Sequence, residues 1–204
     1  DRALHEIYLR AFRIAVQEGR PWSVMTAYNR LNGTYCSENR LLMQNILRDE
    51  WGFDGYVVSD WGATTAERVK CLEAGMDLEM PGKNAANDRQ LVEAVQNGTM
   101  DEKVLDTNVE RILRVMLLTP HYNQYKNSNK PNLKAHAAVT RQVATDGMVL
   151  LKNEKKALPF SSRVKSVALF GKTSYDFIAG GRGSGEVNYF RSMSLKEGLQ
   201  AMGY

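Results

Sequence analysis

The sequence predicts an α/β protein built from parallel strands and crossover helices. Short apolar segments of strand length alternate with segments of helical periodicity through the first 118 of the 204 residues. The segment GYVVS, residues 55–59, is apolar throughout, as expected for a strand buried on both faces of a parallel sheet. A composition of 43% hydrophobic and 25% charged residues is typical of a globular protein with a sizeable core.

The expected elements of this first part follow each other in regular order. We expect a helix over about 3–18, a strand over 23–28, a helix over about 40–50, a strand over 56–59, a helix ending near Gly75, a short strand in MDLEM, a helix over about 87–97, and a long amphipathic helix after it. Thr64 with Glu67, and Thr99 with Glu102, have capping-box spacing, which predicts that these threonines begin two of the helices. Three strand–helix pairs cannot close an eight-stranded barrel, which takes about 250 residues, so we expect polypeptide on both sides of this chain.

Residues 119–134, TPHYNQYKNSNKPNLK, lack any period and are rich in Asn, Pro and Lys, which is typical of a linker. We therefore expect one domain over 1–118 and a second over 135–204. The second begins with a helix near 135–146, followed by strands MVLLK and SVALFG, the latter at 166–171. Charge supports the division, because residues 1–118 hold 14 Lys and Arg against 18 Asp and Glu, whereas the remainder holds 13 against 5.

Several function classes are disfavoured by composition. The lysines are scattered singly, apart from Lys155 and Lys156, without the interleaved aromatics of a nucleic-acid surface. No apolar run approaches the roughly 20 residues that span a bilayer. Cys36 and Cys71 have no metal-ligand spacing with the three histidines, so we expect two packed thiols and no metal or redox cofactor. The N-terminus DRALHEIYLR has neither an initiator Met nor a signal-peptide pattern, which is the appearance of an excised piece and leaves open a cytoplasmic or a secreted protein.

Asp60 is the first candidate for chemistry. It follows a predicted parallel strand, and active sites of α/β proteins collect at the carboxyl ends of such strands. The alternative is a cap or turn residue, although Thr64 or Thr65 already fills that role for the next helix. Trp61 either offers a flat apolar face to a ligand beside the carboxylate or is simply a tryptophan packed in the core or at the rim of the barrel. Tyr28 ends the preceding strand, so the two should be neighbours, and its phenol either holds the carboxylate or merely packs.

Two other motifs are weaker. In GGRGSGEVN, residues 180–188, Glu186 stands where a dinucleotide fingerprint needs glycine, so what remains is a flexible loop that presents Ser184. In MDLEM, Asp77 and Glu79 alternate along a strand, and we expect them to be structural anchors.

Five motifs together carry a family resemblance. SVMTAYNRLNG, LLMQNILRDEWGFDGYVVSDWGA, AGMDLEMPG, VLLKNEKKALPF and GGRGSGEVN occur in this order along the chain. In this combination the chain resembles glycoside hydrolase family 3, specifically its two-domain β-glucosidases. The resemblance implies the C-terminal portion of a (β/α)₈ TIM-type barrel, a linker and the start of an α/β sandwich domain, with an active site between the two domains.

The resemblance also implies roles for individual residues. Asp60 in SDW matches the nucleophile that forms a covalent glycosyl-enzyme, and Trp61 lines the same subsite. Tyr28 matches a tyrosine that contacts the nucleophile, Met25 a methionine in the sugar pocket, and Ser184 a sandwich-domain loop that reaches the substrate.

The implied reaction is retaining hydrolysis of terminal β-D-glucosyl residues from a β-glucoside or cello-oligosaccharide, without a cofactor. Its acid/base glutamate is expected beyond Tyr204, in the remainder of the polypeptide, because Glu186 lies in the substrate loop and not in the acid/base motif. One alternative is β-xylosidase or exo-glucanase activity on the same scaffold, although the SDW form disfavours a xylosidase. The other alternative is a non-catalytic α/β interaction module.

Overall fold

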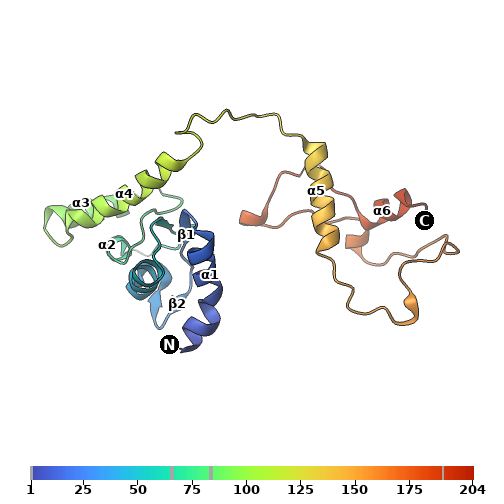
Figure 1. The fold of residues 1–204 in the computed structure, drawn as a ribbon, viewed down its shortest axis with the longest axis horizontal. Helices are drawn as coiled ribbons and strands as arrows, with labels where there is room; N and C mark the ends of the chain where they lie inside the picture. The colour runs from blue at the N-terminus through green and yellow to red at the C-terminus, as the bar shows by residue number, and fades with distance from the viewer. Residues whose placement is uncertain (1, 65–66, 83–84, 190) are drawn as a thin grey trace. The chain divides into compact units, whose positions relative to one another are not determined.

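The computed structural model divides into two compact units, Asp1–Lys126 and Asn127–Tyr204 (Figure 1). It describes residues 2–64, 67–82, 85–189 and 191–204. Helix and strand are mixed in the first unit, so the broad α/β prediction is confirmed there.

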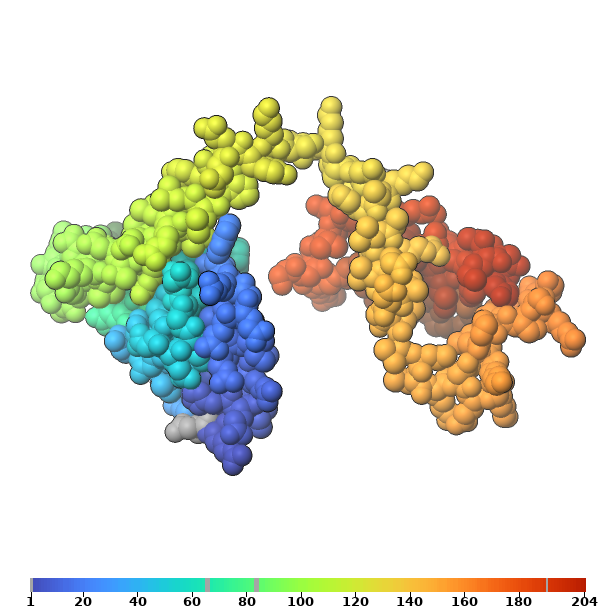
Figure 2. Space-filling view, in the orientation of Figure 1, coloured from blue at the N-terminus to red at the C-terminus, as the bar shows by residue number. Residues whose placement is uncertain are grey.

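In the described residues the first unit runs as two helices, three short strands, two helices, a fourth strand and three helices. Its helical elements are η1 Leu4–Tyr8, α1 Arg10–Gly19, η2 Cys36–Glu38, η3 Leu41–Glu50, α2 Arg68–Glu73, α3 Ala85–Gln96 and α4 Glu102–Leu118. Its strands are β1 Ser23–Met25, β2 Arg30–Leu31, β3 Thr34–Tyr35 and β4 Tyr56–Val58. The helices expected near 3–18, 40–50 and 87–97 are all present, and α3 and α4, green in Figure 2, pack beside α2.

The sheet of this unit is parallel, as expected. β1 pairs with β4 in the register Ser23↔Tyr56 and Met25↔Val58. The MDLEM segment lies on the other side of β4 but contributes a single parallel bridge, Val58↔Leu78, so it is not a full strand. The sequence prediction missed the antiparallel pair β2–β3, which turns through Asn32 and Gly33, both at positive φ. An Asn-Gly pair between two strands is the usual signal for such a hairpin.

The core lies on one face of this parallel sheet. Val57 is buried and Val24 packs against a cluster that includes Met43, Ile46 and Leu47 of η3. Successive strand residues point to opposite faces, and on the other face Met25 is exposed and Val58 is half-buried. The prediction that GYVVS is buried on both faces is therefore wrong in the part of the chain that the structure describes, because Tyr56 and Val58 on the second face are only half-buried.

Both predicted capping boxes are wrong. α2 begins at Arg68, and the Thr64 hydroxyl instead donates to Glu79 Oε1 at 2.6 Å, while Thr65 lies outside the described residues. α4 is capped by Asp101, whose Oδ1 accepts from the Lys103 amide at 3.0 Å, and the Thr99 hydroxyl donates to Asn97 Oδ1. In both cases the threonine hydroxyl has a side-chain acceptor nearby and does not bond a helix amide.

The second unit is helical where it is regular. Its elements are α5 Leu133–Asp146, η4 Glu154–Lys156, η5 Lys172–Ser174, η6 Gly183–Gly185 and α6 Leu195–Ala201. A capping box of Ser194 and Glu197 begins α6.

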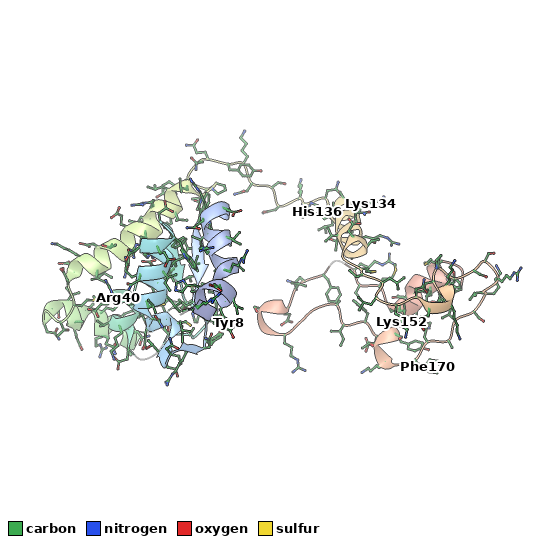
Figure 3. All side chains as sticks on the ribbon, turned by 60° about the horizontal axis from the view of Figure 1, so that its bottom comes forward. Tyr8, Arg40, Lys134, His136, Lys152 and Phe170 are labelled. Atoms are coloured by element: carbon green, nitrogen blue, oxygen red, sulfur yellow. The ribbon has the colours of Figure 1, made fainter. Side chains whose placement is uncertain are left out.

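The strands predicted at MVLLK and SVALFG are wrong, because neither segment pairs with another in the described part of this unit. A strand is defined by ladder hydrogen bonds to a neighbour, and apolar sequence alone does not supply that neighbour. Leu151 and Phe170 are accordingly almost fully exposed. Figure 3 labels Phe170 and also Lys152, the residue that follows Leu151.

Candidate active site

Tyr28 and Asp60 lie together beyond the carboxyl ends of β1 and β4. The Tyr28 phenol donates to the carbonyl oxygen of Trp61 at 2.6 Å. Desolvation, a hydrogen bond with Asp60 and the charge of Asp60 together raise the pKa of Tyr28 above the ordinary tyrosine value. The parallel pairing of β1 and β4 brings these residues together, and the expected proximity of Tyr28 and Asp60 is confirmed.

The Asp60 carboxylate is half-buried and oriented by its own loop. Its Oδ1 accepts from the Trp61 backbone amide at 2.6 Å, and its carbonyl oxygen accepts from Ala63 N at 3.0 Å. Asp60 thus acts as a turn residue, which was the alternative role considered from the sequence. The turn and a reactive role are compatible, because Oδ2 is not used in this turn and a carboxylate can accept several hydrogen bonds.

Three large side chains of this region are more than half exposed: Met25, Tyr28 and Trp61. Met25 is the last residue of β1 and lies three residues before Tyr28 in the sequence. An exposed indole and a phenol beside a carboxylate supply an apolar face and a polar edge, which suits the alternating apolar and hydroxyl surfaces of a sugar.

Backbone and side-chain hydrogen bonds hold the loop after β4 to its neighbours. Gly62 N donates to Met80 O at 3.0 Å, and Met80 N donates to Ser59 Oγ at 2.7 Å. The buried Ser37 hydroxyl donates to Ala63 O at 3.0 Å. The sequence prediction missed Ser37, and only its place after the β2–β3 hairpin could have suggested a position near this loop.

A buried cluster of charged side chains, Asp77, Arg48 and Arg111, contacts β4. Asp77 Oδ2 accepts from Val57 N at 2.6 Å and from Arg48 Nη2 at 2.7 Å, and Asp77 Oδ1 accepts from Arg111 Nη1 at 3.1 Å. Arg48 also donates to the Gly55 and Gly75 carbonyls. These contacts join η3, β4 and α4, so Asp77 is a structural anchor as expected.

Ser184 and Glu186 belong to the second unit. Ser184 lies in the single turn η6, where Gly181 N donates to Gly185 O at 2.9 Å and Glu186 N donates to Gly183 O at 3.0 Å. Both side chains are exposed. The glycine-rich segment therefore forms a tight loop that presents both side chains to solvent.

Other kinds of site are not apparent in this part of the protein. Cys36 and Cys71 are buried, and burial raises the pKa of the Cys36 thiol, which disfavours a reactive thiolate. Among the described residues, no group of three or more His, Cys, Asp or Glu side chains is placed to hold a metal ion. None of the helices described is long and apolar enough to cross a bilayer.

We expect Tyr28 to ionise at a higher pH than an ordinary tyrosine, and Asp60→Asn to lower its pKa, because the substitution removes the carboxylate charge that opposes the phenolate. A raised pKa means that the stability contributed by Tyr28 is complete below the ordinary value of about 10 and is lost as the pH rises through the folded value. NMR titration of ¹³C-labelled tyrosine measures this pKa, with Tyr28→Phe assigning the signal. An unchanged Tyr28 pKa in Asp60→Asn would show that the two groups do not interact.

Residues 1–115 match the family described as Glycosyl hydrolase family 3 N terminal domain. The chain belongs to glycoside hydrolase family 3. The match covers β1, β4 and the loops with Tyr28 and Asp60, and the resemblance seen in the sequence motifs is confirmed.

Relatives in glycoside hydrolase family 3 match nearly the whole chain. Thermostable beta-glucosidase B of Acetivibrio thermocellus is 47% identical over 84% of the chain and 22% of its own length. Beta-glucosidase B of Emericella nidulans is 40% identical over 98% of the chain and 24% of its own length. The structure of beta-glucosidase 3B from Thermotoga neapolitana in complex with α-D-glucose has a TM-score of 0.91 and 44% identity, over 99% of this chain and 29% of that one. The chain thus spans between a fifth and a third of the length of these family members.

Proposed function

We propose that the chain is part of a retaining β-glucosidase that removes terminal non-reducing β-D-glucosyl residues. The observation that carries this proposal is the half-buried Asp60 at the carboxyl end of β4, beside the exposed Trp61, whose amide bonds Asp60 and whose carbonyl oxygen bonds the Tyr28 phenol. Support comes from relatives that are named β-glucosidases, one of them solved with glucose.

In the proposed reaction Asp60 is the nucleophile. One carboxylate oxygen forms a bond to the anomeric carbon as the bond to the aglycone oxygen breaks, and the aglycone leaves with a proton from an acid. The deprotonated acid then takes a proton from a water molecule as that water attacks the anomeric carbon of the glycosyl-aspartate, which releases glucose and restores both the carboxylate and the acid. Tyr28, as a neutral phenol, donates to the Trp61 carbonyl oxygen and so holds the loop of the nucleophile. Trp61 and Met25 hold the apolar parts of the sugar. We place Ser184 at the same sugar from the second unit.

Retention of configuration needs a second carboxyl group about 5–5.5 Å from the nucleophile. We assign this group to polypeptide beyond Tyr204 and not to Glu186, which shares its loop with Ser184. The proposed substrates are β-glucosides or cello-oligosaccharides, and the remainder of a longer polypeptide completes the site.

The proposed architecture follows the same reasoning. We propose that residues 1–118 form the C-terminal part of a (β/α)₈ barrel, that 119–134 link it to the next domain, and that 135–204 begin an α/β sandwich. The parallel β1–β4 pair, with its helices on one face and Met25 exposed on the other, is compatible with a barrel wall whose inner face is still open. The apolar segments of the second unit would find strand neighbours in the sandwich.

A trapping experiment tests the nucleophile. A 2-deoxy-2-fluoro-glucosyl fluoride is incubated with the full polypeptide that contains this chain, because the fluorine at C2 slows an oxocarbenium-like transition state and lets the covalent intermediate accumulate. Trypsin then releases residues 49–68, a peptide that holds Asp49, Asp54 and Asp60. We expect fragmentation by mass spectrometry to place the label on Asp60.

Asp54→Asn is the matched control, because Asp54 is an exposed aspartate in the same peptide. This variant should still be labelled, whereas Asp60→Asn should not. If only the corresponding xylosyl reagent labelled the protein, the assigned activity would be that of a xylosidase and not of a glucosidase. Saturating reagent without any label, in a protein that hydrolyses no aryl glycoside, would refute the proposed function.

A further inference from the structure

We propose that Glu79 is a positioning residue that holds the loop of Asp60 and Trp61 through a hydrogen bond with Thr64. The Thr64 hydroxyl donates to Glu79 Oε1 at 2.6 Å, fifteen residues away in the sequence. The Glu79 carboxylate reaches the loop through Thr64, so its effect on Asp60 and Trp61 is transmitted by the loop. The inference rests on the proposed function for its catalytic consequence, but not for its structural content.

The loop from Asp60 to Thr64 is attached at each step to a different neighbour. Tyr28 binds the Trp61 carbonyl, Met80 O accepts from Gly62 N, and Ser37 binds the Ala63 carbonyl. Thr64 is the last residue of this series, and its attachment is the only one in the series that is made by two side chains. A substitution at Thr64 can therefore remove that link without changing the backbone attachments.

Glu79 is itself held firmly. Its side chain is largely buried, accepts from Asn87 Nδ2 at 2.8 Å, and forms an ion pair with Arg68 Nε at 3.4 Å. Arg68 is the first residue of α2 and is buried, and Asn87 lies in the first turn of α3 and is buried. A carboxylate with an ion pair to α2 and a hydrogen bond from α3 has little freedom, which makes it a rigid point for the loop.

The helix α2 has a second reason to depend on Glu79. Desolvation lowers the pKa of Arg68, and the charge of Glu79 opposes this effect. Removing the carboxylate would leave a buried guanidinium without its counter-charge, which destabilises the fold directly. Thr64 is thus the cleaner site to test, because Arg68 keeps its ion pair and Asn87 keeps its acceptor when only the threonine hydroxyl is removed.

The experiment replaces Thr64 by valine, which has the same shape without the hydroxyl, in the full polypeptide. We expect kcat to fall about 10-fold with KM changed by less than about 3-fold, since misplacing a reacting group by a fraction of an ångström affects the transition state more than binding. Hydrogen exchange of the Gly62 and Ala63 amides should become faster. Thr64→Ser, which restores a hydroxyl, should recover most of kcat and the slow exchange.

Thr107→Val is the matched control. The Thr107 hydroxyl donates to the Lys103 carbonyl on the exposed side of α4, and its loss should leave kcat and loop exchange unchanged. The proposal is overturned if Thr64→Val keeps both kcat and exchange at wild-type values, or if only KM changes. A wild-type protein without glucosidase activity would instead refute the proposed function, and loop exchange alone would then decide whether the link to Glu79 holds the loop.

Discussion

Asp60→Asn, in the full polypeptide that contains this chain, is expected to lower kcat on an aryl β-glucoside on the order of 10⁴-fold or more. The amide keeps the shape of the side chain and can still accept from Trp61 N, so the turn at residues 60–63 should persist. What is lost is the negative oxygen that bonds to the anomeric carbon. The measurement is steady-state hydrolysis, with circular dichroism to show that the fold is retained.

A second variant separates loss of the nucleophile from general damage. Asp60→Gly leaves space where the carboxylate stood, and added azide can attack the anomeric carbon from that side. Because this side is opposite to the β-linked aglycone, the expected product is the α-glucosyl azide. Asp54→Asn, six residues earlier on an exposed position, should remain fully active. Near wild-type kcat in Asp60→Asn would contradict the assignment of Asp60.

The proximity of Tyr28 and Asp60 was predictable because it depends on one rule of sheet geometry. The carboxyl ends of neighbouring parallel strands meet at the same edge, and the strands themselves were recognisable as apolar segments. The register between β1 and β4, with Met25 opposite Val58, was not predictable from the apolar segments alone.

The partners of threonine hydroxyls were not predictable in the same way. Thr64 and Thr99 both had capping-box spacing, yet each hydroxyl bonds another side chain, Glu79 in one case and Asn97 in the other. Local spacing describes only which contacts are available within one turn of helix. For Thr64, an acceptor that the fold brings from fifteen residues away competes with these contacts, and a sequence pattern does not contain it. For Thr99 the competing acceptor is local, because Asn97 lies two residues earlier.

The strands of the second unit illustrate a different limit. MVLLK and SVALFG have the composition of strands, but an isolated apolar segment has no ladder partner and remains irregular, with Leu151 and Phe170 exposed. Strand propensity reflects a neighbour and a covering layer more than the residues themselves. In the first unit the strand prediction succeeds because β1 and β4 are both within the chain and pair with each other.

Asp77→Asn is expected to destabilise the first unit by about 3–5 kcal/mol, the usual cost of removing one partner from a buried ion pair. Arg48 and Arg111, with side chains 6% and 18% exposed, would both lose their counter-charge. The amide nitrogen would also face donors, because Asp77 accepts from Val57 N and from both guanidinium groups. At roughly 2–4 °C per kcal/mol, the melting temperature measured by calorimetry should fall by roughly 6–20 °C.

Glu110→Gln is the matched control for Asp77→Asn. Glu110 pairs with Arg114 at 3.0 Å on the same helix α4, but its side chain is 70% exposed, and such a pair contributes about 0.5 kcal/mol or less. If Asp77→Asn melted like Glu110→Gln, the buried cluster would not anchor β4. The comparison with Thr64→Val is also informative, because Asp77 supports β4 from beneath whereas Thr64 fixes only the loop beyond it. Loss of melting temperature in the first variant and loss of kcat in the second would therefore separate the stability of the strand from the placement of the carboxylate that follows it.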